Sequence, residues 1–171
     1  MSYIDVLILR QLAQGPAHGY ELRKQVEAGT GYVLHNNSLY PALRRMEEAG
    51  VVVKTAQAQE KRPPRHVYEI TEAGRELLHD LLAELPPESA GDEAEFLCRV
   101  AHFDLLAPGE RLAVLDAREK AVEARMAHLR SLDEGARDDR WGSLVTREMI
   151  RRGESERGWL RELRARAGEG A

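Results

Sequence analysis

A short basic stretch is the first feature of the 171-residue sequence that could do chemistry. Residues 54–65 carry four lysine or arginine side chains and one glutamate. Lys61, Arg62 and Arg65 surround the pair Pro63-Pro64, whose fixed backbone angles leave the stretch little conformational freedom to lose on binding. Guanidinium groups on a stiff arm suit the phosphate backbone or the minor groove of DNA. The alternative is a hairpin tip whose charges only face water.

A second group of candidate side chains precedes this stretch on an expected helix. Asn36-Asn37-Ser38 are residue types that commonly cap helices, and the pattern predicts that a helix follows them. Pro41 would then lie in or near its first turn, where a missing amide costs little. Because successive helical residues rotate by about 100°, Leu39, Leu43 and Met46 share one face, which must be buried.

The opposite face of this helix could read DNA bases. Arginine can pair with the edge of guanine, and Asn, Ser and Tyr side chains can hold phosphates or bases. A solvated face with an ordinary Arg44–Glu48 ion pair is the alternative. The exposed face carries Asn37, Pro41, Arg44 and Glu48, with Tyr40 and Arg45 at its borders.

The sequence around these residues predicts the elements that position them. Gly15-Pro16 and Gly50 end helical patterns, and Thr71 is placed to cap a further helix. Two β-type runs form a hairpin with a long tip, to which we confine Pro63-Pro64. Three helices, a hairpin and a further helix are the elements of a winged helix-turn-helix. The first two helices are expected at 3–13 and 18–28, the third from the Asn-Asn-Ser cluster to about 49, and the strands at 51–55 and 66–70.

A proline- and glycine-containing stretch at residues 86–91 divides the chain. We therefore predict a winged helix-turn-helix domain at residues 1–86 and an all-helical dimerisation domain at residues 87–171. The expected fold class is mainly α with a small β-hairpin. Helices of the second domain are expected at about 92–104, 109–134 and 142–167.

The long middle helix of the second domain has a coiled-coil-like seam. Leu115, Val122 and Leu129 repeat every seven residues, with Met126 and Leu132 beside them. Such a seam needs an apolar partner surface, which a second copy of the chain would provide. The sequence therefore predicts a homodimer.

Trp141 and Trp159 are the large aromatic side chains of the second domain. They would pack in the core of the dimer, or they would wall a pocket for a small aromatic effector, because flat ligands stack on indole rings.

The composition is that of a folded protein without a membrane span. Hydrophobic residues make up 43% and charged residues 32% of the chain, and no run of about 18 apolar residues occurs. The start lacks a basic segment before its apolar stretch, so we expect no signal peptide. Cys98 is the single cysteine, which excludes an internal disulfide and favours the cytoplasm. The net charge of −4 argues against a protein that coats nucleic acid non-specifically.

The sequence offers little for catalysis or metal binding. No nucleophile motif, phosphate-binding loop or dinucleotide fingerprint occurs, and Cys98 is expected to be a small core residue. We therefore expect no metal ion, no cofactor and no enzymatic activity. Six histidines lack the close spacing of metal ligands: His18, His35, His66, His79, His102 and His128.

The sequence resembles the PadR family of transcriptional regulators. The order and spacing of short motifs carry the resemblance up to about residue 85, and it extends more weakly through residues 110–129 and 151–163 into the helical dimerisation region of the longer members. The motifs are Gly15-Pro16 with Gly19-Tyr20-Glu21-Leu22, then Ser38-Leu39-Tyr40-Pro41-Ala42-Leu43, Glu47 with Gly50-Val51, and Tyr68-Glu-Ile-Thr71-Glu-Ala-Gly74.

This resemblance implies a homodimer that binds an inverted-repeat operator in double-stranded DNA, usually as a repressor released by a small molecule. The run His35-Asn36-Asn37 departs from the Ser, Pro or Gly that many members have there, and this could alter the preferred bases. The identity of the effector does not transfer from the family. The positions implied to contact DNA are Tyr20, Asn37, Ser38, Tyr40, Pro41, Arg44, Lys61, Arg62 and Arg65.

Two other classes of function stay open. A winged-helix module could bind other proteins without reading DNA, although such a module has no reason to keep Lys61, Arg62 and Arg65 on a stiff tip. A small enzyme is the second alternative, and the absence of a nucleophile paired with a base argues against it.

Overall fold

The computed structural model describes residues 1–59, 62–135 and 140–168. The chain divides into two compact units, Met1–Leu82 and Ala83–Ala171, whereas the sequence places the boundary after residue 86. Among the described residues, no helix is both long enough and apolar enough to cross a membrane.

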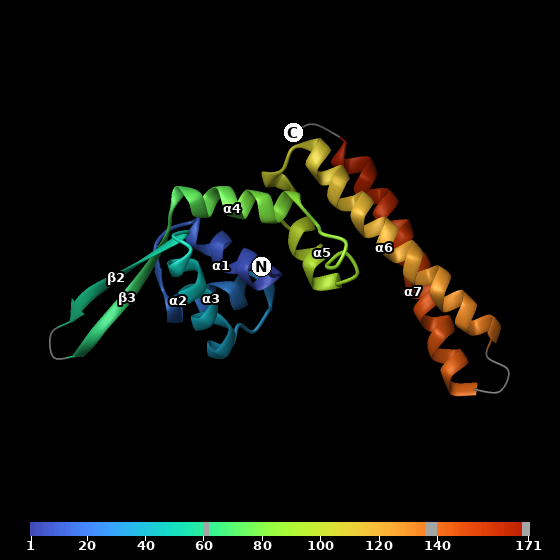
Figure 1. Cartoon of the computed structure of the whole chain (residues 1–171), viewed down its shortest axis with the longest axis horizontal. Helices are drawn as coiled ribbons and strands as arrows, with labels where there is room; N and C mark the ends of the chain where they lie inside the picture. The colour runs from blue at the N-terminus through green and yellow to red at the C-terminus, as the bar shows by residue number, and fades with distance from the viewer. Residues whose placement is uncertain (60–61, 136–139, 169–171) are drawn as a thin grey trace. The chain divides into compact units, whose positions relative to one another are not determined.

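The first unit consists of helices that carry a protruding β-hairpin (Figure 1). Its first helix is buried on nearly all sides, with Val6, Ile8 and Leu9 fully inaccessible to water. Leu22 and Val26 of the second helix lie in the same core. The elements are α1 (Tyr3–Leu12), β1 (Ala17–His18), α2 (Gly19–Thr30), α3 (Asn36–Glu48), β2 (Val52–Gln59), β3 (Arg62–Ile70) and α4 (Glu72–Ala83).

The sheet of the first unit has a strand that the sequence did not predict. In the described part of the chain, three antiparallel strands lie in the order β1-β3-β2. β1 is only two residues long, and Ala17 pairs with Tyr68. Two residues cannot display the alternation by which a strand is recognised, so sequence reasoning had no signal there.

The prediction that confined Pro63-Pro64 to the hairpin tip is wrong. β3 already begins at Arg62, and β2 continues to Gln59, so both prolines lie within a strand. Proline has no amide to donate and is tolerated on a free edge or at an irregularity. Both conditions hold here, because β1 covers β3 only near Tyr68 and the register shifts between Gln57 and Gln59.

Helix α4 is held closely against the start of β2. The Thr71 hydroxyl donates to the Gly50 carbonyl (2.9 Å), and it accepts a hydrogen bond from the Gly74 amide (3.1 Å). A Cβ atom on Gly74 would lie 2.2 Å from the Val51 carbonyl oxygen. Position 74 must therefore be glycine for this contact to form. The contact joins α4 to the base of the hairpin.

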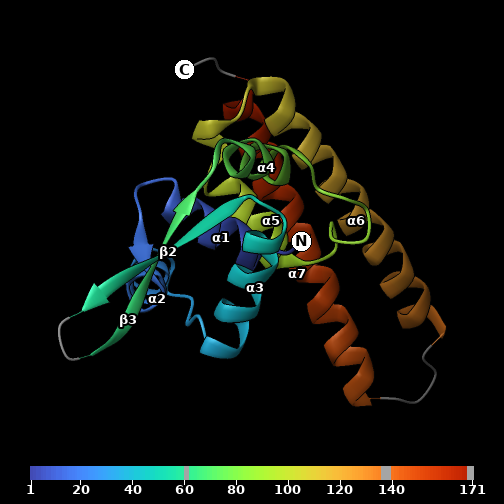
Figure 2. The same ribbon diagram turned by 60° about the vertical axis from the view of Figure 1, so that its left-hand side comes forward.

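The second unit contains an antiparallel pair of long helices, α6 and α7 (Figure 2). Asp92 caps α5 by accepting hydrogen bonds from the amides of Ala94 and Glu95. The expected helix at 92–104 ends early, at Val100, and a short 3₁₀ turn follows. The elements are α5 (Glu93–Val100), η1 (Phe103–Leu105), α6 (Pro108–Gly135) and α7 (Arg140–Ala167).

The heptad seam of α6 is buried within its own chain. Leu115, Val122 and Leu129 have exposed fractions of 1%, 6% and 7%. α7 provides much of the cover, and it comes close because a Cβ on Gly153 would lie 2.8 Å from Met126 Cγ. The inference that the seam needs a second copy of the chain is therefore wrong, since sequence periodicity cannot distinguish a neighbouring helix of the same chain from that of a partner.

We predict that Gly74→Ala lowers the free energy of unfolding by about 1–3 kcal/mol, because the added methyl group overlaps the Val51 carbonyl. Denaturant titration followed by circular dichroism measures the effect. Gly29→Ala is the matched control: its new Cβ would meet Gln11 at an ordinary 3.7 Å, and alanine favours the helix. Equal destabilisation by the two substitutions would contradict the prediction.

Candidate nucleic-acid interface

Helix α3 has the two faces that the sequence predicts. Its inner face is buried in the core, with Leu39, Leu43 and Met46 at 0–1% exposure. On its outer face, Tyr40 is 47% exposed, the Arg44 side chain is 80% exposed, and Asn37 and Pro41 are also exposed, while Ser38 is half-buried. The core contacts set the rotation of the helix about its axis, and this rotation turns the polar and aromatic groups outward.

The start of α3 differs from the prediction by a few residues. The helix begins at Asn36, and the carbonyl of His35 accepts the amides of Ser38 and Leu39. Pro41 is therefore the sixth residue of the helix and not part of its first turn. Without an amide, Pro41 cannot donate the usual helical hydrogen bond to the carbonyl of Asn37.

The two adjacent arginines of α3 have different partners. Arg44 Nε lies 2.9 Å from Glu48 Oε1, and both side chains are largely exposed. Arg45 Nη2 donates to Asp5 Oδ1 at 3.0 Å, and the Asp5 side chain is only 2% exposed. Asp5 also accepts the amide of Ser2, so Arg45 anchors α3 to a buried carboxylate of α1. Both arginines reach solvent, but Arg44 is the more exposed, at 80% against 56%, and it is not tied to a buried group.

The N-terminus of α2 lies against the outer face of α3. A Cβ on Gly19 would lie 3.1 Å from the Tyr40 ring, so the absence of a side chain lets the ring approach. Tyr20, which is 55% exposed, has Lys24 Nζ 4.8 Å and Arg23 Cζ 5.5 Å from its ring centre. Tyr20 is among the positions that the family resemblance implies, whereas Arg23 and Lys24 are not. Their spacing of three and four residues from Tyr20 is a signal that could have identified this group.

The base of the hairpin is tied to the start of α2. His18 pairs with Val67, and its ring nitrogen Nδ1 lies 2.9 Å from the carbonyl oxygen of His66. Burial raises the pKa of the Tyr68 phenol, and the nearby Tyr40 and Glu47 raise it further. Tyr68 therefore stays neutral near pH 7 and acts as a packing residue under the hairpin.

The candidate residues of the wing are described only in part. Arg65 is exposed in β3 and pairs with Gln57 of β2, so it lies on the hairpin as the sequence predicts. Arg62 begins β3, but its side chain is not among those described. Lys61 lies outside the described residues. Lys54, on β2, is an additional exposed cation nearer the base of the hairpin.

The arrangement can bind a polyanion without any catalytic chemistry. Arginine, lysine, tyrosine and asparagine side chains stand exposed on α2, α3 and the hairpin of one unit. In the described ranges, no three potential metal ligands gather in one place. Cys98 is buried, which raises the pKa of its thiol to about 11, and it is the small core residue that the sequence predicts.

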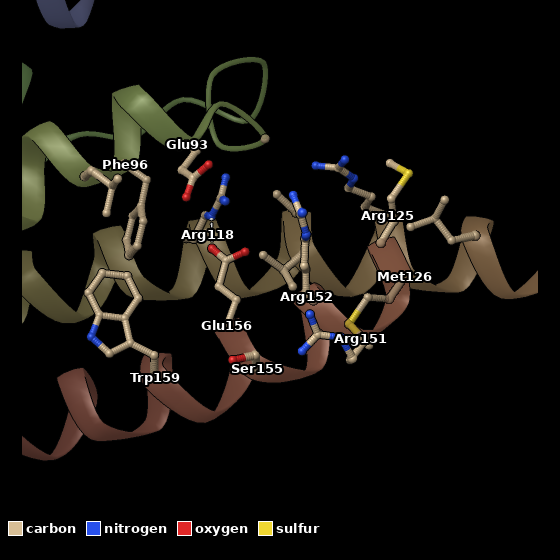
Figure 3. A pocket seen from close by; sticks show the side chains of 17 residues that line it. Glu93, Phe96, Arg118, Arg125, Met126, Arg151, Arg152, Ser155, Glu156 and Trp159 are labelled. Atoms are coloured by element: carbon tan, nitrogen blue, oxygen red, sulfur yellow. Dashed lines mark hydrogen bonds and ion pairs between the residues drawn. The ribbon is translucent and has the colours of Figure 1, made fainter. Parts of the chain in front are cut away.

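The two tryptophans lie in different surroundings. Trp159 is partly buried and packs edge-to-face on Phe96, with ring centroids 5.9 Å apart. It lines a groove of about 620 Å³ between α5, α6 and α7 (Figure 3). Trp141 is 77% exposed and is not among the residues that line this groove. The structure of the single chain therefore does not bring both tryptophans into one pocket. An effector pocket walled by both stays a prediction.

Comparison with protein families matches both units. Residues 8–80 match the model of the PadR-like family of transcriptional regulators, and residues 94–167 match the model described as the C-terminal region of virulence activator alpha. The chain belongs to the PadR-like family. Members of this family are transcriptional regulators, which are not enzymes. Its DNA-binding part is the winged helix-turn-helix that the sequence predicts, extended by the third strand β1.

Individual relatives are more distant. The chain is 33% identical over 120 residues to the uncharacterized 37.1 kDa protein in transposon TN4556 of Streptomyces fradiae, a match that covers 66% of the chain and 33% of that protein. It is 23% identical to the negative transcriptional regulator PadR of Bacillus subtilis (strain 168), over 77% of the chain and 72% of PadR. A crystal structure of B. subtilis PadR in complex with operator DNA matches 96% of the chain and 98% of its own, with 20% identity and a TM-score of 0.46. The chain thus spans about a third of the length of the Streptomyces relative.

We predict that Arg45→Ala lowers the free energy of unfolding by about 1–3 kcal/mol, because the buried Asp5 carboxylate loses a charged hydrogen-bond donor. Arg44→Ala is the matched control on the same helix. It removes only an exposed ion pair and should cost no more than about 0.5 kcal/mol. Thermal unfolding of both variants gives the comparison, and a larger loss for Arg44→Ala would refute the assignment.

Proposed function

We propose that the protein is a sequence-specific DNA-binding repressor that acts as a homodimer on an inverted-repeat operator and responds to a ligand. The main support for DNA binding is the outer face of α3. It exposes Asn37, Tyr40 and Arg44 while its opposite face is locked in the core. An α-helix with such a face fits the major groove, where base edges can be read.

Arg44 is the residue that we assign to base reading. Its pair with Glu48 is solvent-exposed, and pairs of this kind contribute little to stability. Breaking it to form two hydrogen bonds with a guanine therefore costs little. Asn37, near the start of the helix, has an amide that could pair with adenine.

The remaining cations are assigned to the phosphate backbone. Arg65 is exposed on β3, and Arg23 and Lys24 lie beside the exposed Tyr20 ring. Contacts of this kind position a protein on DNA without reading its sequence. Lys61 and Arg62 are also assigned to the phosphate backbone, because they lie in the same basic stretch of the sequence.

We predict that Arg44→Ala weakens binding to the cognate operator by about 1–3 kcal/mol and relaxes the preference at one base position. Arg65→Ala should instead weaken binding to all sequences alike and lower the slope of log K against log salt by about one. Operator selection followed by salt-dependent binding assays separates the two effects.

Arg75→Ala, an exposed change on α4, is the control and should leave both quantities unaltered. Equal losses for Arg44→Ala on cognate and random DNA would remove Arg44 from base reading. Failure of the unaltered protein to select any DNA would favour the alternative, a module that binds other proteins.

The proposed dimer uses apolar side chains that the chain itself leaves uncovered. Leu132 of α6 is 49% exposed, and Trp141, Leu144 and Val145 at the start of α7 are 77%, 52% and 60% exposed. A group of large apolar side chains on a surface usually marks an interaction site. A second copy of the same patch would cover it in a symmetric dimer, which suits two half-sites of an inverted repeat.

We predict that Trp141→Lys converts the dimer into a monomer at micromolar concentration, because the change buries an unpaired charge in the proposed interface. Sedimentation equilibrium measures the mass. Leu105→Lys, at a 43% exposed apolar position outside the patch, is the control and should stay dimeric. Persistence of the dimer in Trp141→Lys would show that the patch is not the interface.

The proposal also includes repression and a response to a ligand. The B. subtilis relative is named a negative transcriptional regulator, which supports repression. A ligand can release DNA only if it binds better to a form of the protein that binds DNA poorly, and DNA must then weaken ligand binding by the same factor. The proposed role places the protein in the cytoplasm, the compartment that the sequence predicts.

A further inference from the structure

The groove of the second unit has the size of a ligand site. Its volume is about 620 Å³, within the range of about 300–1,000 Å³ usual for small-molecule pockets. Much of its lining is apolar, and methionines and small residues leave it adaptable. The apolar lining comes from Phe96, Leu97, Ala121, Val122, Met126, Leu129, Met149 and Trp159.

The groove is elongated along the two long helices. On α6 its lining runs from Arg118 to Leu129, and on α7 from Met149 to Trp159. At 1.5 Å per helical residue, each span is about 16 Å. The sequence predicts a flat aromatic effector, but a groove of this length favours a ligand with an extended apolar body.

The arginines of the groove are unevenly distributed along it (Figure 3). Arg125, Arg151 and Arg152 lie farther from Phe96 and Trp159 than the other labelled charged groups, Glu93, Arg118 and Glu156.

Two of these three arginines, Arg151 and Arg152, share one carboxylate, that of Glu148. Hydrogen bonds from Arg151 and Arg152 lower the pKa of Glu148 to about 2, so it stays ionised. In the described part of the chain, no carboxylate partner is recorded for the exposed Arg125. This end of the groove therefore carries excess positive charge.

Arg118, which lies between the two ends, is already paired with a carboxylate. Its side chain is 5% exposed, and it donates to Glu156 Oε1 (2.7 Å) and to the carbonyl of Ala90 (2.9 Å). Its guanidinium also lies 5.3 Å from the centre of the Phe96 ring. The charge of Arg118 is therefore already compensated by Glu156, so Arg125 is the residue that we assign to a ligand's acid group.

We propose that the groove binds an elongated, amphipathic monoanion whose acid group is held by Arg125 and whose apolar body extends toward Phe96 and Trp159. The charge at one end selects an anion over a neutral molecule of the same length. The length of the apolar lining selects a long chain over a short one, because each buried methylene strengthens binding about fourfold.

The site has a route by which it could influence DNA binding, and this regulatory meaning rests on the proposed function. Arg118 and Glu156 line the groove, and Arg118 also holds the Ala90 carbonyl in the segment that follows α4 along the chain. A ligand that moves Arg118 alters the hold on that segment. Binding itself does not depend on DNA, so it can be tested separately.

The test uses the full chain with Trp141→Phe, which leaves Trp159 as its single tryptophan. Hexanoate, octanoate and decanoate are titrated below their micelle concentrations while Trp159 emission is followed, with 1-decanol as the neutral probe. We expect saturable binding that tightens with chain length and is weaker for decanol. Arg125→Gln should weaken decanoate binding about tenfold, and Arg125→Glu should weaken it further. Arg161→Gln, an exposed change on α7 outside the groove, should have no effect.

The proposal is overturned if decanol binds as tightly as decanoate, or if the Arg125 and Arg161 variants behave alike. It is also overturned if no probe changes Trp159 emission, as when a second copy of the chain fills the groove. Operator binding by the unaltered chain is measured in parallel, because Trp141 belongs to the proposed dimer interface. Loss of DNA binding with intact decanoate binding would reject the proposed function and leave the ligand site standing.

Discussion

The burial of one face of α3 is the constraint on which the candidate interface depends. Leu39, Leu43 and Met46 are almost completely removed from water, and together they contribute on the order of 5 kcal/mol of hydrophobic stabilisation. Any rotation of the helix would expose them. The orientation of Tyr40 and Arg44 toward solvent is therefore a consequence of core packing, and no interaction of the outer face itself is needed to maintain it.

The connections around α3 extend this constraint to the rest of the first unit. Arg45 ties the helix to the buried Asp5 of α1, and Gly19 lets the Tyr40 ring rest on the start of α2. Gly74 brings α4 against the base of the hairpin. Positions 19 and 74 belong to the motifs that carry the family resemblance, and the contacts give a physical reason for glycine at each. A bulkier side chain would displace a ring or a backbone carbonyl.

The second unit covers its main helical seam but leaves two apolar surfaces open. Its α6 seam is covered within the chain, yet an apolar patch around Trp141 and a long groove beside Trp159 stay open. Arg118 is central to this unit because one buried guanidinium joins α6, α7 and the segment around Ala90. The two tryptophans, which look equivalent in the sequence, are thus assigned to different surfaces: Trp141 to the proposed dimer and Trp159 to the proposed ligand groove.

The sequence by itself determined the elements whose signals are local. Apolar periodicity, capping residues and glycine or proline stops were enough to find the helices, the hairpin and the two faces of α3. Only the tertiary structure decided which of two adjacent arginines is anchored to the core, because Arg45 meets a buried carboxylate forty residues away. The same holds for β1 and for the cover of the α6 seam. Each depends on a partner distant along the chain, and a pattern read over a few residues carries no information about such a partner.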